Sequence, residues 1–478
     1  MALVAGIDSS TQSCKVVVRD LATGAIVREG RAVHPGGSEI DPHAWWEALL
    51  RALDDAGGID DVSALSVAAQ QHGMVVLDQK GNVIRKALLW NDVRSAEAAE
   101  ELIDEFGRTT LADRTGSVPV ASFTATKLRW LRDHEPENTQ RVAAVALPHD
   151  WLTWRVLGYG PKEDSPLGPD LAALVTDRSD ASGTLCWSPK NDAYDKDIIR
   201  SALGHVPTLP RVLGPGARAG VTVSNVAPVI PEGIVVGAGA GDNAAAALGL
   251  GASRGDVVMS IGTSGTVFAV FNKPTADASG TVCGFADATG EYLPLVATLN
   301  AARILDTIAD LLGVDHVELG RLAQVATPGS GGLVLQPYFE GERTPNLPFA
   351  TATLFGMSLA STTRSNLARA AFEGLLCGLA DGLDALSALG VEPQRILLIG
   401  GAASNAAVVQ VAAQVFDVPI VVPERDQYVA NGAARQAGWA YMGRPVEWKL
   451  DIADRPDRDF HPEIRRQYAL HRFEYDAT

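Results

Sequence analysis

The stretch that decides the fold runs from Ile234 to Gly251 and reads Ile-Val-Val-Gly-Ala-Gly-Ala-Gly-Asp-Asn-Ala-Ala-Ala-Ala-Leu-Gly-Leu-Gly. Its pattern predicts a short buried β-strand, a glycine turn and a helix that begins at Asp242, because alanine and leucine favour helix and nothing β-branched interrupts them. The glycines leave the turn without side chains, so its backbone N–H groups can approach a phosphate or a sugar closely.

Asp242 is the candidate catalytic residue of this stretch. It stands at the positive end of the helix dipole, which favours the ionised carboxylate. A carboxylate fixed there can accept a proton from a substrate hydroxyl. One alternative stays open, namely that the residue only caps the helix. Another, that the turn is a dinucleotide-binding G-x-G-x-x-G, fails because the third glycine would fall on Asp242.

The composition is that of a soluble globular protein of two or more domains. The chain has 478 residues, and 40 lysines and arginines stand against 57 acidic residues, which gives a net charge of −17. Such a surface argues against non-specific binding to nucleic acid or to anionic membranes. No signal-peptide core precedes Asp8 and no apolar run is long enough to span a bilayer, so we expect a cytoplasmic protein.

Four cysteines lie far apart in the sequence, without a C-x-x-C pair or histidines at zinc-ligand spacing. They are Cys14, Cys186, Cys283 and Cys377. We expect reduced thiols in the core rather than disulfides or a zinc site.

The chain has two similar openings, each a strand, a tight turn of small polar residues and a second strand. The two turns are Asp8-Ser9-Ser10-Thr11 and Gly262-Thr263-Ser264-Gly265. Strands alternate with helices elsewhere, which predicts an α/β fold. The repeated opening predicts two related domains that meet near residue 245, with residues 1–245 in the first domain and 246–478 in the second.

These two turns are candidate phosphate-binding sites. Hydroxyls and free N–H groups on a tight turn can hold a polyphosphate, and Asp8 could hold Mg²⁺ through water. The alternative is that each is an ordinary β-turn. Gly262–Gly265 is one residue short of the esterase motif G-x-S-x-G, and no G-x-x-x-x-G-K-[ST] motif occurs.

Two further segments are candidates for binding a hydroxyl-rich ligand. Gln70-Gln71-His72-Gly73 follows a predicted strand and offers donors and acceptors, although a lone histidine is more often a core or surface residue. Trp90-Asn91-Asp92 could supply an aromatic wall and polar groups for a sugar. The alternative is a core tryptophan followed by a helix N-cap.

Taken in chain order, these pieces resemble the FGGY carbohydrate kinases, and among them most closely the xylulokinases, over about residues 3 to 475. The matching segments are Gly6–Thr11, Gln70–Gly73, Leu89–Asp92, Gly237–Asn243, Gly262–Gly265, Gly341–Pro345 and Leu398–Asn405. The resemblance implies two ribonuclease-H-like domains of the actin–hexokinase superfamily, with the sugar and Mg-ATP in an interdomain cleft that closes to exclude water. It implies ATP-dependent phosphorylation of D-xylulose to D-xylulose 5-phosphate in D-xylose catabolism.

The resemblance also implies roles for individual residues. Asp242 would be the general base, and Mg²⁺ would be held by Asp8 through water. The sugar would be bound by Gln71, His72, Trp90, Asn91, Asp242 and Asn243. The nucleotide and its phosphates would be bound by Asp8, Thr11, Gly262, Thr263, Ser264, Gly400, Gly401 and Asn405. Its small-molecule partners would be D-xylulose and Mg-ATP, and homodimer formation stays open.

The chain departs from the family pattern at three positions. Ser10 replaces the glycine of Asp-x-Gly-Thr in the first turn, Gln71 stands where many xylulokinases carry methionine, and Ala402 replaces the third glycine of the adenosine loop.

Two other classes of function stay open. The first is a related kinase acting on ribulose, gluconate or glycerol, although glycerol kinases resemble one another in an Arg-Glu pair where this chain has Gln71-His72. The second is a sugar-sensing or actin-like protein without turnover. That class predicts loss of the aspartate pair, whereas Asp8 and Asp242 are both present.

Overall fold

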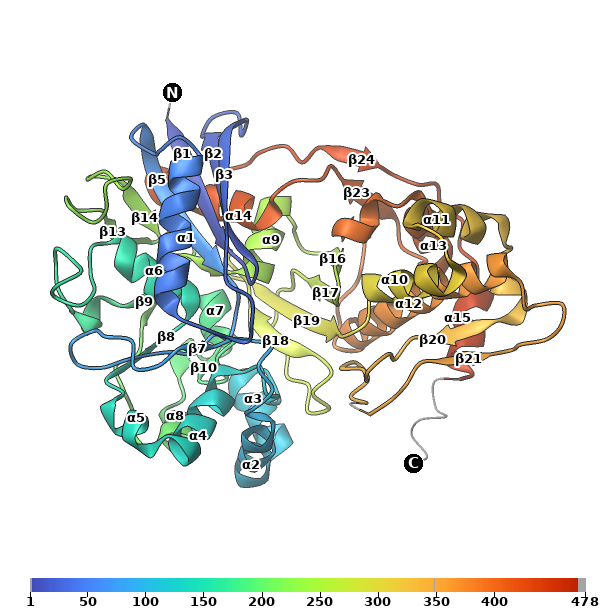
Figure 1. Cartoon of the computed structure of the whole chain (residues 1–478), viewed down its shortest axis with the longest axis horizontal. Helices are drawn as coiled ribbons and strands as arrows, with labels where there is room; N and C mark the ends of the chain where they lie inside the picture. The colour runs from blue at the N-terminus through green and yellow to red at the C-terminus, as the bar shows by residue number, and fades with distance from the viewer. Residues whose placement is uncertain (1, 348, 472–478) are drawn as a thin grey trace. The chain divides into compact units, whose positions relative to one another are not determined.

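The computed structural model describes residues 2–347 and 349–471, and Figure 1 labels its helices and strands. The chain divides into two compact units. The first comprises Met1–Ala252, Asn272–Leu293 and Gln427–Lys449, and the second comprises Ser253–Phe271, Pro294–Asp426 and Leu450–Thr478. The chain therefore passes between the units more than once. The domain division near residue 245 stays a prediction.

A mixed sheet forms the centre of the first unit. Its strand order is β13 (Arg218–Val221), β14 (Val235–Gly237), β5 (Val62–Ala69), β1 (Leu3–Ser9), β2 (Ser13–Asp20) and β3 (Ile26–Val33), and β15 (Ala240–Gly241) also pairs with β5. β1 and β2 are the predicted hairpin, and they pair antiparallel from Leu3 opposite Asp20 to Ser9 opposite Cys14. β1, β14 and β15 all run parallel to β5.

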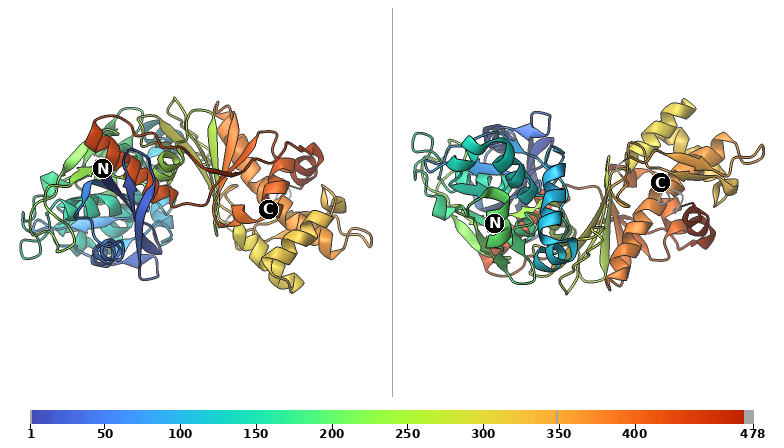
Figure 2. Two further views of the ribbon diagram at one scale, coloured as in Figure 1. Left: turned by 90° about the horizontal axis from the view of Figure 1, so that it is seen from above. Right: turned by 90° about the horizontal axis from the view of Figure 1, so that it is seen from below.

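Both faces of this sheet are covered, as the alternation of side chains along β1 requires. On one face, Ala5 and Ile7 pack in a core with the helices α1 (Pro42–Asp55) and α6 (Pro148–Val156). On the other face, Val4 packs against α14 (Tyr428–Met442), which Figure 2 shows in red beside the blue strands. Gly6 permits this approach, because a Cβ there would lie 1.8 Å from the backbone oxygen of Ala430.

Helix α9 (Asp242–Leu250) is the helix that the central stretch predicts, and it packs closely against α14. The backbones meet at two glycines: a Cβ on Gly249 would lie 1.9 Å from the oxygen of Tyr428, and one on Gly432 would lie 1.8 Å from that of Ala245. The position of Asp242 at the start of α9 is therefore fixed by a helix almost two hundred residues later in the chain.

The remaining elements of the first unit are short strands and helices. The strands are β4 (Glu39–Ile40), β6 (Val75–Leu77), β7 (Ala87–Leu88), β8 (Ala144–Ala146), β9 (Val175–Asp177), β10 (Trp187–Ser188), β11 (Ala193–Tyr194), β12 (Arg211–Leu213) and β18 (Cys283–Ala286). The helices are α2 (Ala96–Phe106), α3 (Arg108–Thr115), α4 (Thr124–His134), α5 (Pro136–Arg141), α7 (Arg178–Ser182) and α8 (Lys196–Leu203), with a 3-10 turn at Leu171–Ala173.

The second unit repeats the opening of the first. β16 (Asp256–Ile261) and β17 (Gly265–Ala269) form the second predicted hairpin, and β16 runs parallel to β22 (Arg395–Ile399). The other strands are β19 (Tyr292–Thr298), β20 (Val334–Gln336), β21 (Thr353–Phe355), β23 (Ile420–Pro423) and β24 (Ile452–Asp454). The helices are α10 (Ala302–Leu312), α11 (His316–Val325), α12 (Arg364–Ala388), α13 (Ala406–Val415) and α15 (Pro462–Ala469), with 3-10 turns at Ser330–Gly332 and Gly401–Ser404.

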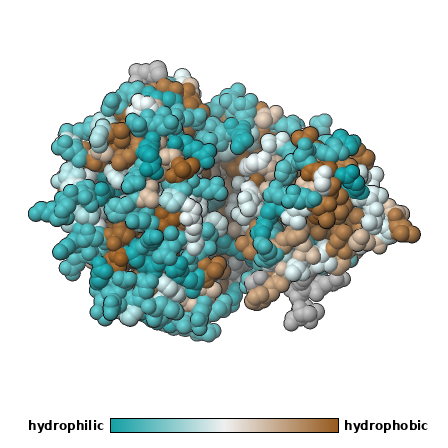
Figure 3. Space-filling view, viewed as in Figure 1, coloured by the Kyte–Doolittle hydropathy of each residue, from teal (hydrophilic) through white to brown (hydrophobic). Residues whose placement is uncertain are grey.

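All four cysteines are buried, and none forms a disulfide within the described residues, as expected. The face of the first unit in Figure 3 is mostly hydrophilic, in agreement with the large net charge. Within residues 2–347 and 349–471, no helix combines the length and the apolar composition needed to cross a bilayer.

Candidate active site

Neighbouring parallel strands of the first unit end at one edge of its sheet, and the predicted site residues follow those ends. Ser9 at the end of β1 lies opposite Ala69 at the end of β5. Gly241 at the end of β15 also lies opposite Ala69. Gln70 follows Ala69 and Asp242 follows Gly241, so both residues lie at the same edge of the sheet. The carboxyl ends of parallel strands are where α/β proteins place their ligands.

Asp242 is the first residue of α9, and Gly241 is the N-cap. One oxygen of Asp242, Oδ1, accepts hydrogen bonds from the backbone N–H of Asn243 at 2.8 Å and from its side-chain Nδ2 at 2.9 Å. The N-cap position itself is held by Gly241, which has no side chain. Asp242 therefore stands one residue inside the helix, where it still accepts one of the first backbone N–H groups. Its catalytic role stays a prediction.

The carboxyl of Asp242 has a strongly perturbed pKa. Burial, and then the negative charges of Asp8 and Asp180, raise it from 3.8 to about 7. A carboxyl with a pKa near neutrality can take up and release a proton at physiological pH, which is the property that a general base needs.

Asp8 is almost fully buried at the end of β1, with 2% of its surface exposed. Its Oδ1 accepts a hydrogen bond of 2.6 Å from the Ser10 hydroxyl, and its Oδ2 lies 3.4 Å from Nζ of Lys15. Burial raises the pKa of Asp8, against the opposing effects of Lys15 and Ser10. The first departure from the family pattern thus adds a hydrogen bond that glycine could not make.

Thr11, Gln70 and Trp90 are joined by hydrogen bonds. The indole Nε1 of Trp90 donates to Oγ1 of Thr11 at 2.9 Å, and this hydroxyl donates to Oε1 of Gln70 at 3.3 Å. Trp90 is 37% exposed, so it is not a core residue. Nε2 of Gln70 is buried and has no hydrogen-bond partner within the described residues. Buried donors normally find an acceptor, so this amide is suited to a ligand oxygen or a water molecule.

Gln71 connects the predicted sugar-binding residues to Asp242. Its Oε1 accepts a hydrogen bond from Nδ2 of Asn243 at 3.2 Å. The same Nδ2 of Asn243 also donates to Oδ1 of Asp242. Its Nε2 donates to the backbone oxygen of Ser179 at 3.4 Å. A Cβ on Gly241 would lie 2.7 Å from Cγ of Gln71, so the glutamine packs directly on the turn. Methionine at this position could not form these two hydrogen bonds.

His72 has a left-handed backbone, with φ of 68°, which is uncommon for a residue other than glycine. Its Nδ1 lies 2.6 Å from the backbone oxygen of Gly183. The half-buried ring packs on Phe123 and Phe285, with centroid separations of 5.1 and 5.7 Å. These contacts fix the ring beside Gln71 without enclosing it in the core.

The backbone oxygen of His72 is held by two side chains of α4. Nζ of Lys127 donates to it at 2.8 Å and to the oxygen of Ser122 at 2.7 Å, and the Thr124 hydroxyl donates at 3.2 Å. Burial lowers the pKa of Lys127 to about 7. These hydrogen bonds stabilise the unusual conformation of His72.

The two residues after Trp90 have different environments. Asn91 is exposed. Asp92 is buried, accepts a hydrogen bond from Ser38 at 2.8 Å and pairs with Nε of Arg94 at 2.8 Å. The N-cap of α2 is Ser95. The alternative that Asp92 caps the following helix is therefore wrong, and its role is in the ion pair.

The second unit brings the other two predicted loops together in the same way. Because β16 and β22 are parallel neighbours, the Gly262–Ser264 turn and the loop at Gly400 start from adjacent strand ends. Gly400 has a φ of +96°, and a Cβ there would lie 2.5 Å from the oxygen of Ile261. Only glycine permits this approach. Thr263 in the first of these loops and Gly401 in the second are exposed.

Asn405 and Ala402 have clear local roles. Oδ1 of Asn405 caps α13 by accepting from the N–H of Ala407 at 2.9 Å, and Nδ2 donates to the oxygen of His316 at 3.2 Å. Ala402 lies within the 3-10 turn Gly401–Ser404, whose backbone conformation does not require glycine. The nucleotide roles of this loop stay predictions.

A buried charged cluster beside the site escaped the sequence analysis. Nδ1 of His149 lies 2.6 Å from Asp180, and its Nε2 lies 3.3 Å from Asp150 and 3.9 Å from Asp177. Burial alone would lower the pKa of His149, but the carboxylates of Asp150, Asp180 and Asp177 raise it to about 9. The cluster thus places one histidine among three buried carboxylates, whose charges favour the protonated imidazole.

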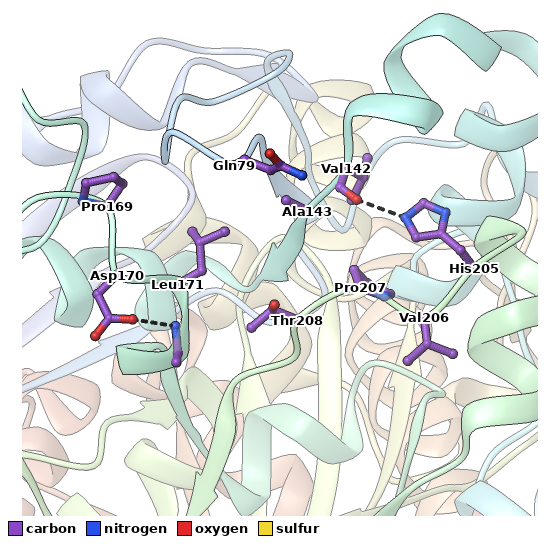
Figure 4. A pocket seen from close by; sticks show the side chains of 11 residues that line it. Gln79, Val142, Ala143, Pro169, Asp170, Leu171, His205, Val206, Pro207 and Thr208 are labelled. Carbon is purple, nitrogen blue, oxygen red and sulfur yellow. Dashed lines mark hydrogen bonds between the residues drawn. The ribbon is translucent and has the colours of Figure 1, made fainter.

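A separate groove in the first unit, of about 560 Å³, contains none of the predicted site residues. Figure 4 shows its two internal hydrogen bonds, in which Nε2 of His205 lies 2.8 Å from the oxygen of Val142 and Asp170 accepts from the N–H of Ala172. These polar groups are used within the protein, and the strand ends remain the better candidate site.

Known proteins share this architecture. The model for the N-terminal domain of the FGGY family of carbohydrate kinases matches residues 3–249, and the model for the C-terminal domain matches residues 257–441. The xylulose kinase of Streptomyces coelicolor is 45% identical over 448 residues, which cover 92% of this chain and 88% of that protein. That of Streptomyces rubiginosus is 44% identical over 452 residues, with the same coverage.

A solved structure agrees. The crystal structure of xylulose kinase from Bifidobacterium adolescentis has 46% sequence identity and a TM-score of 0.92, and the match covers 98% of this chain and 99% of that one. The predicted two-domain fold of the actin–hexokinase type is confirmed. The chain belongs to the FGGY family of carbohydrate kinases.

Proposed function

We propose that the chain transfers the γ-phosphoryl group of ATP to D-xylulose and forms ADP and D-xylulose 5-phosphate. The choice of sugar is supported by the similarity to xylulose kinases over nine-tenths of the chain. The observation that carries the chemistry is Asp242 at the first residue of α9, with a pKa near 7 and hydrogen-bonded to Asn243.

Asp242 acts as the general base in this proposal. Phosphoryl transfer passes through a loose transition state, so positioning and charge stabilisation contribute more than the strength of the base. Asp242 therefore orients the 5-hydroxyl of the sugar and takes its proton late in the reaction. The bonds from Asn243 to Oδ1 fix the carboxylate and leave Oδ2 to face the substrate.

The rest of the sugar site would come from Gln71, His72, Trp90, Asn91 and Asn243. Gln71 and Asn243 are already hydrogen-bonded to each other, and Trp90 is exposed and available for contact. A sugar with several hydroxyls needs this mixture of donors, acceptors and an aromatic surface. Nε2 of Gln70 would be a further donor.

The residues present fit a magnesium ion. Asp8 and Asp242 are both carboxylates with raised pKa values, and the charge of Asp8 contributes to the shift at Asp242. A cation near both would relieve this repulsion, and Mg²⁺ prefers oxygen ligands. We assign Asp8 to hold it through water; bound with ATP, it would neutralise charge on the phosphates. Thr11 would contact the phosphates.

The second unit would bind the nucleotide. Thr263 is exposed on a tight turn beside Ser264, and Gly400 is exposed at the neighbouring strand end. Together with Gly262 they would contact the phosphates. Gly401 and Asn405 would contact the adenosine, with Asn405 also keeping its capping bond.

The product tests this proposal. ATP, Mg²⁺ and D-xylulose are incubated with the enzyme, and the product is analysed by ³¹P and ¹³C NMR. The proposal predicts a phosphate monoester coupled to C5. A phosphate on another carbon, or ADP and inorganic phosphate without a sugar phosphate, would contradict it.

His72→Ala should lower kcat/KM for D-xylulose. The loss of transition-state binding should be about 1–3 kcal/mol, the usual cost of an unmade buried hydrogen bond. The loss should appear mainly in KM, and deoxy analogues that lack the contacted hydroxyl should lose less. His205→Ala is the matched control, because its ring also contacts a backbone oxygen but lies in the separate groove. A lower melting temperature with an unchanged ratio between sugars would remove His72 from the sugar site.

The pH dependence of kcat/KM should reflect the raised pKa of Asp242. A protonated carboxyl cannot accept the substrate proton, so activity should be full above the pKa and should fall as the pH drops through about 7. Bound cations would shift this limb downward. Profiles from about pH 5 to about pH 9 at saturating Mg-ATP check it. A flat profile over that range would contradict the assignment.

A further inference from the structure

Helix α7 (Arg178–Ser182) lies against the strand that leads into Asp242, although it supplies none of the predicted site residues. Asp177 is its N-cap and accepts from the N–H groups of Ser179 and Asp180. Asp177 is 3% exposed, and Ser179, Asp180 and Ser182 are completely buried. A buried polar helix of this kind needs every donor and acceptor to be used.

The hydroxyl of Ser179 has two partners. It donates its proton to Oδ2 of Asp177 at 2.6 Å and accepts the backbone N–H of Gly241 at 3.0 Å. Because the proton is committed to the carboxylate, a lone pair of the oxygen is directed at Gly241. Gly241 is the N-cap of α9, so this bond acts one residue before Asp242.

The other side of the same turn is held separately. Gln436 accepts from the N–H of Gly239 at 2.8 Å and donates to its oxygen at 2.7 Å. The ring of His149 packs so closely on Gly239 that no Cβ would fit there. Gly239 is three residues before Asp242, so the Ser179 bond is the nearer restraint on the carboxylate.

The backbone of the same helix contacts the predicted sugar site. The oxygen of Ser179 accepts from Gln71 at 3.4 Å, and the oxygen of Gly183, the residue after α7, lies 2.6 Å from Nδ1 of His72. These contacts use backbone atoms, whereas the contact to Gly241 uses a side chain. A substitution at Ser179 therefore removes the contacts of the hydroxyl to Gly241 and Asp177 and keeps the backbone contacts to Gln71 and His72.

We propose that Ser179 is a positioning residue for phosphoryl transfer, an inference that rests on the proposed function of Asp242. Its hydroxyl, oriented by Asp177, fixes the Gly241 amide and thereby sets the direction of the Asp242 carboxylate. A misplacement of about 1 Å at a reacting group can cost about 100-fold in rate. Substrate affinity depends on other atoms and should change little.

The test is Ser179→Ala, with kcat and KM measured separately for the sugar. We expect kcat to fall about 10- to 100-fold, with KM for the sugar within about twofold of wild type, since the lost interaction orients the base rather than binding the ground state. Ser179→Cys replaces the hydroxyl with a somewhat larger thiol that is a weaker acceptor, and its kcat should fall between those of Ser179→Ala and wild type.

Ser182→Ala is the matched control. Its hydroxyl is equally buried in the same helix and makes two hydrogen bonds, to the oxygen of Ser179 at 2.7 Å and from the N–H of Ala286 at 3.0 Å. We expect a similar loss of melting temperature with kcat preserved. If Ser179→Ala fails to fold, the kcat of Ser179→Cys relative to Ser182→Ala decides.

Wild-type kcat in the folded Ser179 variants, with only a lower melting temperature, would overturn the inference. So would equal losses of kcat in the Ser179 and Ser182 variants. The kcat of each variant is compared with that of the wild type on whichever sugar the wild type phosphorylates. If that sugar is not D-xylulose, the proposed function is contradicted, and the same comparison still tests the role of Ser179.

Discussion

Asp242→Asn should lower kcat by about 10²–10⁴-fold while the fold and sugar binding stay nearly intact. The amide is of the same size and can keep the hydrogen bonds from Asn243 to its oxygen, so α9 should form as before. It cannot accept the proton of the sugar hydroxyl, and it removes the negative charge opposite Asp8. The measurement is kcat with D-xylulose and Mg-ATP, with sugar binding followed by calorimetry.

Asp41→Asn is the matched control for this substitution. Asp41 is also at a helix start, where it caps α1, but it lies outside the site. Asparagine is an equally good N-cap, so turnover should be unchanged. An Asp242→Asn enzyme that keeps more than about a tenth of wild-type turnover would be incompatible with a general base of the usual strength.

Asp8→Ala should lower turnover by about 10²–10³-fold, the usual cost of losing one preorganised electrostatic group. If Asp8 holds Mg²⁺ through water, the loss should appear in the use of Mg-ATP, and higher Mg²⁺ should restore part of it. Sugar affinity without nucleotide should stay the same, because the sugar contacts come from other residues. Kinetics over a range of Mg²⁺ concentrations and sugar calorimetry check both expectations.

Asp20→Ala controls for the loss of a buried carboxylate in the same hairpin. Asp20 ends β2, is 5% exposed and accepts hydrogen bonds from Thr23. Its removal should lower stability without changing the Mg²⁺ dependence. If the sugar affinity of Asp8→Ala collapsed together with its activity, Asp8 would have a structural role instead.

The local elements of the fold could be predicted because they depend on neighbouring residues. The two hairpins form at the predicted turns, and α9 begins at Asp242 as its alanine run indicates. The start of α12 shows a local signal of the same kind, since the side chain of Thr363 caps the helix by accepting the N–H of Asn366. Turn chemistry, capping and periodicity are all short-range signals.

Contacts between residues far apart in the chain could not be predicted from the sequence. Glycine usually destabilises a strand or a helix. The absence of a Cβ at Gly6, Gly249 and Gly432, however, lets the backbone of another element pack closely there. Trp90 likewise has a long-range contact, because its indole donates a hydrogen bond to Thr11 in a distant turn. The pattern of a single sequence does not show how β1, β5 and β15 pair with one another. This register brings the site residues together.

The cluster around His149 was missed for the same reason. His149 and Asp180 are separated by thirty residues, and neither belongs to a metal-binding or catalytic motif. The local signals were weak: the adjacent pair His149-Asp150, and the run Asp177-Arg-Ser-Asp180, in which two acids begin a short helix. Their burial, and hence their shifted pKa values, follows only from the packed structure.

The most direct test of the central claim is the steady-state kcat/KM of the wild type for D-xylulose, D-ribulose, gluconate and glycerol. A coupled assay for ADP release measures all four with the same enzyme. We expect D-xylulose to be preferred over each of the others by at least about tenfold, a difference of about 1.4 kcal/mol in transition-state binding. A higher value for another substrate, or no sugar-dependent ADP release, would contradict it.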